Sequence, residues 1–272
     1  MKKLIALILS IVSIMTACFC MTGCKKDKNE YVDVTTKRIT VGYTIYSPMN
    51  YKENGVLKGF DTELALVVFN TLGYDVKFTP IEWSNKYMEL NGGAIDCIWN
   101  GFTMNSSDKI DGVDTPRDQI VSFTQPYMYN AQCIVRLNTT ADLSSKEQFA
   151  TKSVAYEAGS AAVDFVDTLE NVNKKPLTSQ MDALKEVKAG TADYAVVDVI
   201  LAKANAGKGN YANLAINQGL EMAQELYGIA FKNGSLLTAK VNTMLKALAE
   251  TGVLMEIATK YGLQDVVITN FI

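Results

Sequence analysis

The 272-residue chain carries 26 Lys and Arg against 29 Asp and Glu, and this nearly neutral balance argues against a nucleic-acid partner, because phosphates are bound by concentrated positive charge. The chain has no histidine, which excludes Ser-His-Asp and Cys-His catalysis and removes the commonest ligand of catalytic zinc. We therefore expect neither a metal nor a cofactor, although catalysis by carboxyl groups alone stays open.

The first 24 residues have the pattern of an export signal. Two lysines precede an apolar stretch over residues 4–14, and small residues follow. The box MTGC ends at Cys24 and is typical of a lipoprotein signal, in which the cysteine receives lipid. We expect residues 1–24 to be a lipoprotein signal peptide lipidated at Cys24, and residues 25–37 to be a linker. A competing box ends at Cys18, and ordinary cleavage or retention as a membrane anchor are the alternatives.

The first part of the mature chain predicts strands and helices in alternation. The expected elements are a strand at 39–44, a helix from 59 to 72 capped by Asp61 or Thr62, a strand around 76–78, a short helix from Ser84 to Gly92, and a buried strand at 95–99. This order favours a mostly parallel sheet, in which ligands bind beyond the carboxyl ends of the strands. The stretch WNGFTMN at 99–105, where the last strand meets a polar loop, is therefore the first candidate site. Its Gly101 allows a ligand to approach the backbone closely.

A second α/β unit follows the polar loop at 105–114. The expected elements are a strand at 131–137, a strand at 152–156, a helix opened by Gly159 and Ser160, a helix with a capping box formed by Ser179 and Asp182, a buried strand at 192–198, a strand at 226–231, and two amphipathic C-terminal helices. The βα pattern thus occurs twice, which predicts two similar lobes with a cleft between them. Cys97 and Cys133 both lie in apolar strands, and we expect two separate buried thiols rather than a disulfide.

The order of these motifs resembles the extracellular solute-binding proteins of bacterial ABC importers, family 3, in the branch that captures amino acids. The motifs are, in chain order, Tyr46 to Pro48, GFDTELA, GGAIDCIWNG, SFTQPY, AYEAGS, GTADYAVVD and LYGIAF, and they cover nearly all of residues 38–264.

The resemblance implies an α/β, two-lobed periplasmic-binding-protein-like fold of type II, in which each lobe is a mostly parallel sheet flanked by helices. It implies a first lobe made of residues 38–130 plus 226–272 and a second lobe made of residues 131–225. Two hinge strands, around Gln132 to Val135 and Tyr227 to Ala230, would join the lobes.

An amino acid carries a carboxylate and an ammonium, and burying both requires a cation and an anion a short distance apart. The resemblance implies that Arg117, six residues before Phe123, binds the carboxylate with its planar fork. The loop before Arg117 is longer than the usual turn of the family, so Lys109 is the alternative. Asp198, at the end of a buried strand, is the expected partner of the ammonium, and an N-cap role for the following helix is compatible with this.

The other expected ligand contacts lie beside these charges. Asn100, Gly101 and Thr103 would contribute backbone and hydroxyl groups. On the second lobe, the turn at Ser160 and Ala161 opens a helix whose N–H groups suit a carboxylate, although the family often has a hydroxyl residue where Ala161 stands. The aromatic candidates for packing the ligand's side chain are Tyr46, Trp83 and Phe102, each of which fits a core role equally well.

The predicted function is capture of an amino acid and its delivery to an ABC permease, without chemistry. We expect a monomer, lipid-anchored on the outer face of the cytoplasmic membrane. Since no second acid is clearly aimed at a ligand side chain, a polar or neutral amino acid is favoured. The alternatives are a dehydratase-like enzyme acting on a small acid on the same scaffold, and a ligand-sensing domain for a separate receptor.

Overall fold

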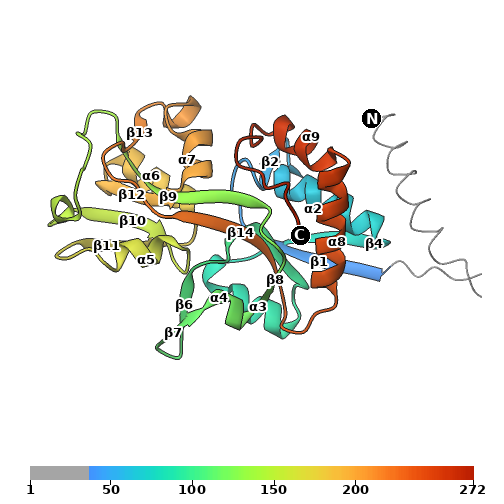
Figure 1. Ribbon diagram of the computed structural model, residues 1–272. Helices are drawn as coiled ribbons and strands as arrows, with labels where there is room; N and C mark the ends of the chain where they lie inside the picture. Colours follow the sequence, from blue (N-terminus) through green and yellow to red (C-terminus); the bar gives the residue numbers. More distant parts are fainter. Residues whose placement is uncertain (1–36) are drawn as a thin grey trace, which may run out of the picture.

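The computed structural model describes residues 37–272, in two α/β lobes that lie side by side (Figure 1). The predicted signal peptide, the linker up to residue 36 and the lipidation site Cys24 lie outside the described residues. Strands β9 (Met128–Leu137) and β14 (Gln224–Phe231) run from one lobe into the other. The predicted two-lobed α/β fold is confirmed.

The larger lobe contains β1 (Lys37–Tyr43), β2 (Tyr51–Glu53), β3 (Val56–Lys58), α2 (Phe60–Thr71), β4 (Tyr74–Pro80), η1 (Trp83–Asn85), α3 (Lys86–Gly92), β5 (Cys97–Thr103), β6 (Ser107–Ile110), β7 (Val113–Pro116), α4 (Arg117–Ile120), β8 (Ser122–Phe123), α8 (Leu237–Glu250) and α9 (Val253–Lys260). The smaller lobe contains η2 (Lys146–Phe149), β10 (Ser153–Glu157), α5 (Ala162–Val166), β11 (Asn173–Leu177), α6 (Gln180–Ala189), β12 (Tyr194–Asp198), α7 (Val199–Asn205), η3 (Gly209–Tyr211) and β13 (Leu214–Ile216).

The sheets of the two lobes join edge to edge, in the order β11-β10-β12-β9-β14-β5-β1-β4. Pairing is parallel between β1 and its neighbours and between β10 and its neighbours. It is antiparallel where β9 meets β14, from Ala131 opposite Gln224 to Met128 opposite Tyr227. The parallel strands β5, β10 and β12 end at this junction, where the carboxyl ends of strands form a crevice.

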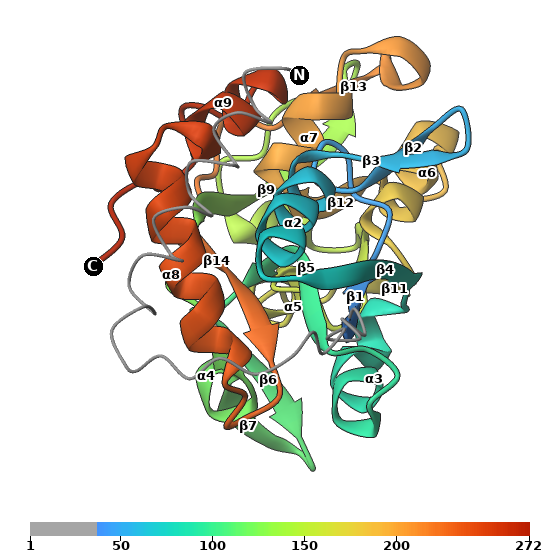
Figure 2. The ribbon, with the colours of Figure 1, turned by 90° about the vertical axis from the view of Figure 1, so that its right-hand side faces the viewer.

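Helices cover both faces of the larger lobe's sheet (Figure 2). On one face α2, α8 and α9 pack together, and the buried stripe of α2 includes Leu64 and Val68, as its helical spacing predicts. On the other face, beside α3 and α4, Ile98 and Phe102 of β5 join a separate apolar cluster. β5 is therefore buried along its whole length.

Several local expectations were wrong. The strand predicted at 95–99 ends later than expected, since β5 runs to Thr103 and β14 pairs along it as far as that residue, so WNGFT belongs to the strand and the loop begins only after it. The polar loop at 105–114 instead forms the hairpin β6–β7. Helix α2 has Gly59 at its N-cap position, and Asp61 points inward, where its carboxyl group accepts hydrogen bonds from the Tyr127 hydroxyl and the Gly101 N–H.

Two smaller expectations hold. Cys97 and Cys133 are both buried free thiols. The Ser179 side chain caps α6 by accepting a hydrogen bond from the Asp182 N–H.

None of the helices in residues 37–272 has both the length and the apolar character needed to cross a membrane.

Candidate functional site

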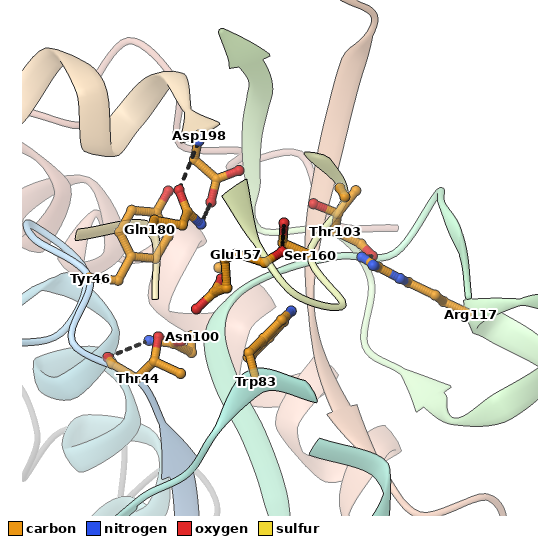
Figure 3. A pocket seen from close by; sticks show the side chains of 12 residues that line it. Thr44, Tyr46, Trp83, Asn100, Thr103, Arg117, Glu157, Ser160, Gln180 and Asp198 are labelled. Carbon is orange, nitrogen blue, oxygen red and sulfur yellow. Dashed lines mark hydrogen bonds between the residues drawn. The ribbon is translucent and has the colours of Figure 1, made fainter. Parts of the chain in front are cut away.

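A small cavity lies at the junction of the lobes (Figure 3). It offers about 10 Å³ of space to water, which is enough for about one molecule, so a larger ligand can enter only if the lobes move apart. Its lining residues are Thr44, Tyr46, Trp83, Asn100, Gly101, Thr103, Arg117, Glu157, Ser160, Ala161, Gln180 and Asp198. All the ligand-binding residues predicted from the sequence, except Phe102, are among these lining residues.

Phe102 lies beneath the site rather than in its wall. Its ring packs edge-on against Trp83, at 4.9 Å between ring centroids, and against Phe123, at 5.0 Å. The Arg117 guanidinium carbon lies 5.2 Å from the Phe102 ring centroid, within cation–π range. Phe102 therefore does not line the cavity, where we expected it to contact a ligand. Its ring instead packs under Arg117.

Arg117 is the cation at the cavity and is 1% exposed. Its Nε and Nη2 donate to the two carboxylate oxygens of Asp108, at 3.1 and 3.0 Å. Its Nη1 donates to the Thr103 carbonyl at 3.0 Å, and its Nη2 also donates to the Gly159 carbonyl of the other lobe at 3.3 Å. Four of the guanidinium's five N–H donors are thus used within the protein. The contact to Gly159 is the one that separation of the lobes would release.

The longer loop before Arg117 supplies its partner. Asp108 lies in β6 of the hairpin, and besides Arg117 it contacts the Lys86 ammonium at 3.2 Å and the Tyr87 hydroxyl at 2.6 Å. Burial would raise the pKa of Asp108, but Arg117 and Lys86 hold it below its usual value. Lys109, the alternative cation, is exposed and pairs with Asp167 at 3.6 Å. The structure therefore gives Arg117, not Lys109, the position at the cavity.

Asp198 ends β12 and is 5% exposed. It occupies the predicted N-cap position of α7, but its side chain makes no capping hydrogen bond. The carboxylate instead accepts hydrogen bonds from the side-chain amides of Asn130, at 2.9 Å, and Gln132, at 2.6 Å, and from Gln180.

A second acid, Glu225, faces Asp198, and the sequence analysis missed it. It accepts hydrogen bonds from the same two amides, Asn130 at 2.7 Å and Gln132 at 3.0 Å, and from the Thr103 hydroxyl at 3.0 Å. No Lys or Arg of the described chain forms a salt bridge with either carboxyl group. Burial and the neighbouring Asp198 raise the pKa of Glu225 to about 7, and burial raises that of Asp198. The pair is an anionic site without an internal cation.

The smaller lobe contributes a third acid, Glu157, at the end of β10. Glu157 is 3% exposed, and its Oε1 has no hydrogen-bond partner among residues 37–272. Burial and the charge of Asp198 raise the pKa of Glu157 to about 8, although Lys86 acts in the opposite direction. The adjoining Ser160 hydroxyl donates to the Glu157 carbonyl at 2.8 Å, so it stiffens the turn. The helix that this turn opens, α5, has only five residues.

Hydrogen bonds within the protein and close packing hold the remaining wall together. The hydroxyls of Tyr46 and Tyr227 are hydrogen-bonded to each other at 2.7 Å. Gly101 lies beside both rings with φ 58°, and a Cβ there would approach Tyr46 to 2.7 Å. The Asn100 amide is committed to protein partners, since it donates to the Thr44 carbonyl at 3.0 Å and to the Asn50 side chain at 2.7 Å. Asn100 therefore shapes the wall and has no free amide N–H to offer.

The chain is similar to known proteins over most of its length. Residues 39–264 match the family model of bacterial extracellular solute-binding proteins, family 3. The chain is 26% identical to "Probable amino-acid-binding protein YxeM" of Bacillus subtilis (strain 168), over 98% of both chains. Among solved structures, an ancestral arginine-binding protein bound to arginine has a TM-score of 0.74 at 28% identity, covering 82% of this chain and 97% of that one. A substrate-binding protein of an ABC uptake transporter from Streptococcus pneumoniae with bound histidine has the same TM-score and identity, covering 86% of this chain and 96% of that one.

Proposed function

Because the chain belongs to the bacterial extracellular solute-binding proteins of family 3, we propose that it binds an amino acid between its lobes and delivers it to the membrane permease of an ABC importer. The names of the matched relatives support an amino-acid ligand.

The observation that carries this proposal is the position of Thr103 between two opposite charges. Its carbonyl accepts a hydrogen bond from Arg117, and its hydroxyl donates to Glu225. The Arg117 guanidinium and the Glu225 carboxyl group therefore both contact Thr103, and Arg117 and Asp198 line the same cavity. An amino acid presents a carboxylate and an ammonium at a similarly short separation, and burying them is tolerable only if both are paired.

The proposed contacts follow from the positions of Arg117 and of the acids. The ligand's carboxylate would bind Arg117, taking the N–H that now reaches the Gly159 carbonyl, and the backbone at Ser160 and Ala161 would approach it from the smaller lobe. The ammonium would lie between Asp198 and Glu225, which have no internal cation. Tyr46 and Trp83 would flank the side chain.

Binding would proceed by opening and closing of the lobes. The present cavity has space for about one water, so the ligand must enter an open form and be enclosed on closure. The charges of the ligand would favour the closed form, and the permease would recognise that shape. The lobes that move would be residues 38–130 plus 226–272 and residues 131–225, hinged at β9 and β14.

We also propose that the protein acts as a monomer, attached by lipid at Cys24 to the outer face of the cytoplasmic membrane. The sequence box MTGC supports this attachment. Replacing Cys24 by Ala should release the protein from cell membranes into the medium. Release only after replacement of Cys18 would assign the lipid to the other box.

A thermal-shift screen of the purified, ligand-free protein against the twenty amino acids, several sugars and short peptides tests the proposal. A ligand at about a thousand times its dissociation constant stabilises the folded state by roughly 4 kcal/mol. For a chain of this size the midpoint should rise by roughly 8 to 16 °C. No rise with any amino acid would contradict the proposal, and chemical turnover of a bound acid would favour the enzyme alternative.

A further inference from the structure

Glu157 is the one acid at the cavity that the proposed contacts leave without a partner. It is 3% exposed, and its Oε1 accepts no hydrogen bond within the described chain. Figure 3 shows its carboxyl group pointing into the space between Tyr46, Trp83 and Asn100. A buried carboxyl oxygen without a hydrogen-bond partner is costly in a folded protein, so an acid in this position needs an explanation.

The buried cations beside the cavity already have an anionic partner. Arg117 and Lys86 both contact Asp108. The ligand's ammonium would lie between Asp198 and Glu225. No Lys or Arg of the described chain forms a salt bridge with Glu157. The cavity wall next to it is formed by the aromatic side chains of Tyr46 and Trp83. An acid and aromatic faces together suit a cation, especially a guanidinium.

We propose that Glu157 is a specificity-determining residue that selects an amino acid with a cationic side chain. This inference rests on the proposed function, and it replaces the polar or neutral ligand that the sequence favoured. Burial and the charge of Asp198 raise the pKa of Glu157 to about 8, so the protein itself disfavours the ionised carboxylate, and a cationic ligand would stabilise it.

Pairs of ligands with nearly the same shape and different charge test the inference. L-citrulline has the shape of L-arginine but a neutral urea group, and norleucine has the carbon chain of L-lysine without its ammonium. Isothermal titration of the wild-type protein should show at least one basic amino acid binding roughly 10- to 100-fold more tightly than its neutral counterpart, because the neutral ligand leaves the acid unpaired.

The Glu157→Gln variant should lower the affinity for the basic ligand by roughly 10- to 100-fold and change that for the neutral one by less than about threefold. Glu170→Gln, which removes the same charge from an exposed position of the same lobe, is the matched control and should change neither. Circular dichroism checks that both variants fold. If Glu157→Gln does not fold, the two wild-type ligand pairs decide the question.

Two failures can be told apart. If amino acids bind but neither basic ligand is preferred, or if Glu157→Gln keeps the wild-type preference, the role of Glu157 is refuted and the proposed function stands. If no amino acid binds the folded wild-type protein, the proposed function fails, and the inference fails with it.

Discussion

Replacing Glu225 by Gln should make the ligand-free protein more stable and the ligand bind less tightly. Glu225 faces Asp198 with no internal cation, and both accept hydrogen bonds from Asn130 and Gln132. A glutamine at position 225 can keep its oxygen toward those amides and turn its N–H₂ toward Asp198. The amide N–H₂ would thus supply, from within the protein, part of the hydrogen bonding to Asp198 that we assign to the ligand's ammonium.

The magnitude follows from the pKa of Glu225, which burial and then Asp198 raise from 4.5 to about 7. Between these values the folded protein keeps a proton that the unfolded chain has lost, so the free energy of unfolding falls as the pH rises from about 4.5 to 7. The loss amounts to roughly 3 kcal/mol at pH 8. Glu225→Gln removes it, which should raise the melting temperature at pH 8 by roughly 6 to 12 °C.

Thermal melts of wild type and Glu225→Gln at pH 5 and pH 8, with ligand titrations at pH 8, test this reasoning. The melting difference should be small at pH 5 and largest at pH 8, and affinity should fall at least tenfold. Glu221→Gln, at an exposed acid four residues earlier, should change neither quantity. A variant that melts lower at pH 8 and binds normally would show that Glu225 is only part of a structural hydrogen-bond network.

Three further changes have clear expected results. Arg117→Ala should abolish binding and lower the free energy of unfolding by roughly 3 kcal/mol in urea melts, because it leaves Asp108 without its main partner. Arg117→Lys should retain weak binding. Wild-type affinity in Arg117→Ala would refute the carboxylate site. Gly101→Ala should destabilise the folded protein by about 1 to 3 kcal/mol and weaken binding, since the new Cβ would meet the Tyr46 ring at 2.7 Å and the φ of residue 101 is 58°. An unchanged melting temperature would show that the Tyr46 and Tyr227 rings can shift at little cost. Cys97 and Cys133 should resist iodoacetamide in the folded protein and react after unfolding, as read by peptide mass spectrometry, whereas rapid labelling in the folded state would contradict their burial.

Two of the charged residues that line the cavity, Asp198 and Arg117, could be proposed without a structure. Asp198 follows an apolar strand, whereas Arg117 was proposed from the resemblance, which implies an arginine six residues before Phe123. The alternation of apolar residues also predicted most helices and strands, because each buries one face.

The missed residues depend on contacts between distant segments. Glu225 joins Asp198 only because β12 and β14 both pair with β9, and nothing local to residue 225 indicates this. One signal was present: Asn130 and Gln132 alternate with Ala131 and Cys133, which places two amides on one face of the strand, between the apolar Met128 and Ile134. Such a face requires polar partners when it is buried.

Asp108 was missed for a different reason. Residues 105–114 are polar and have the composition of a solvated loop, so nothing in this stretch indicates that one of its acids contacts Arg117. The hairpin β6–β7 brings Asp108 to Arg117 and Lys86. This pairing also changes one expectation, because Arg117 now contributes to stability as well as to the proposed binding.

The proposed binding site can be examined in a crystal structure of the protein with the amino acid that gives the largest thermal shift. We expect the ligand's carboxylate to accept hydrogen bonds from Arg117 and its ammonium to donate to Asp198 and Glu225. A ligand bound with its ammonium away from both acids, or with its carboxylate beyond reach of Arg117, would refute the proposed site.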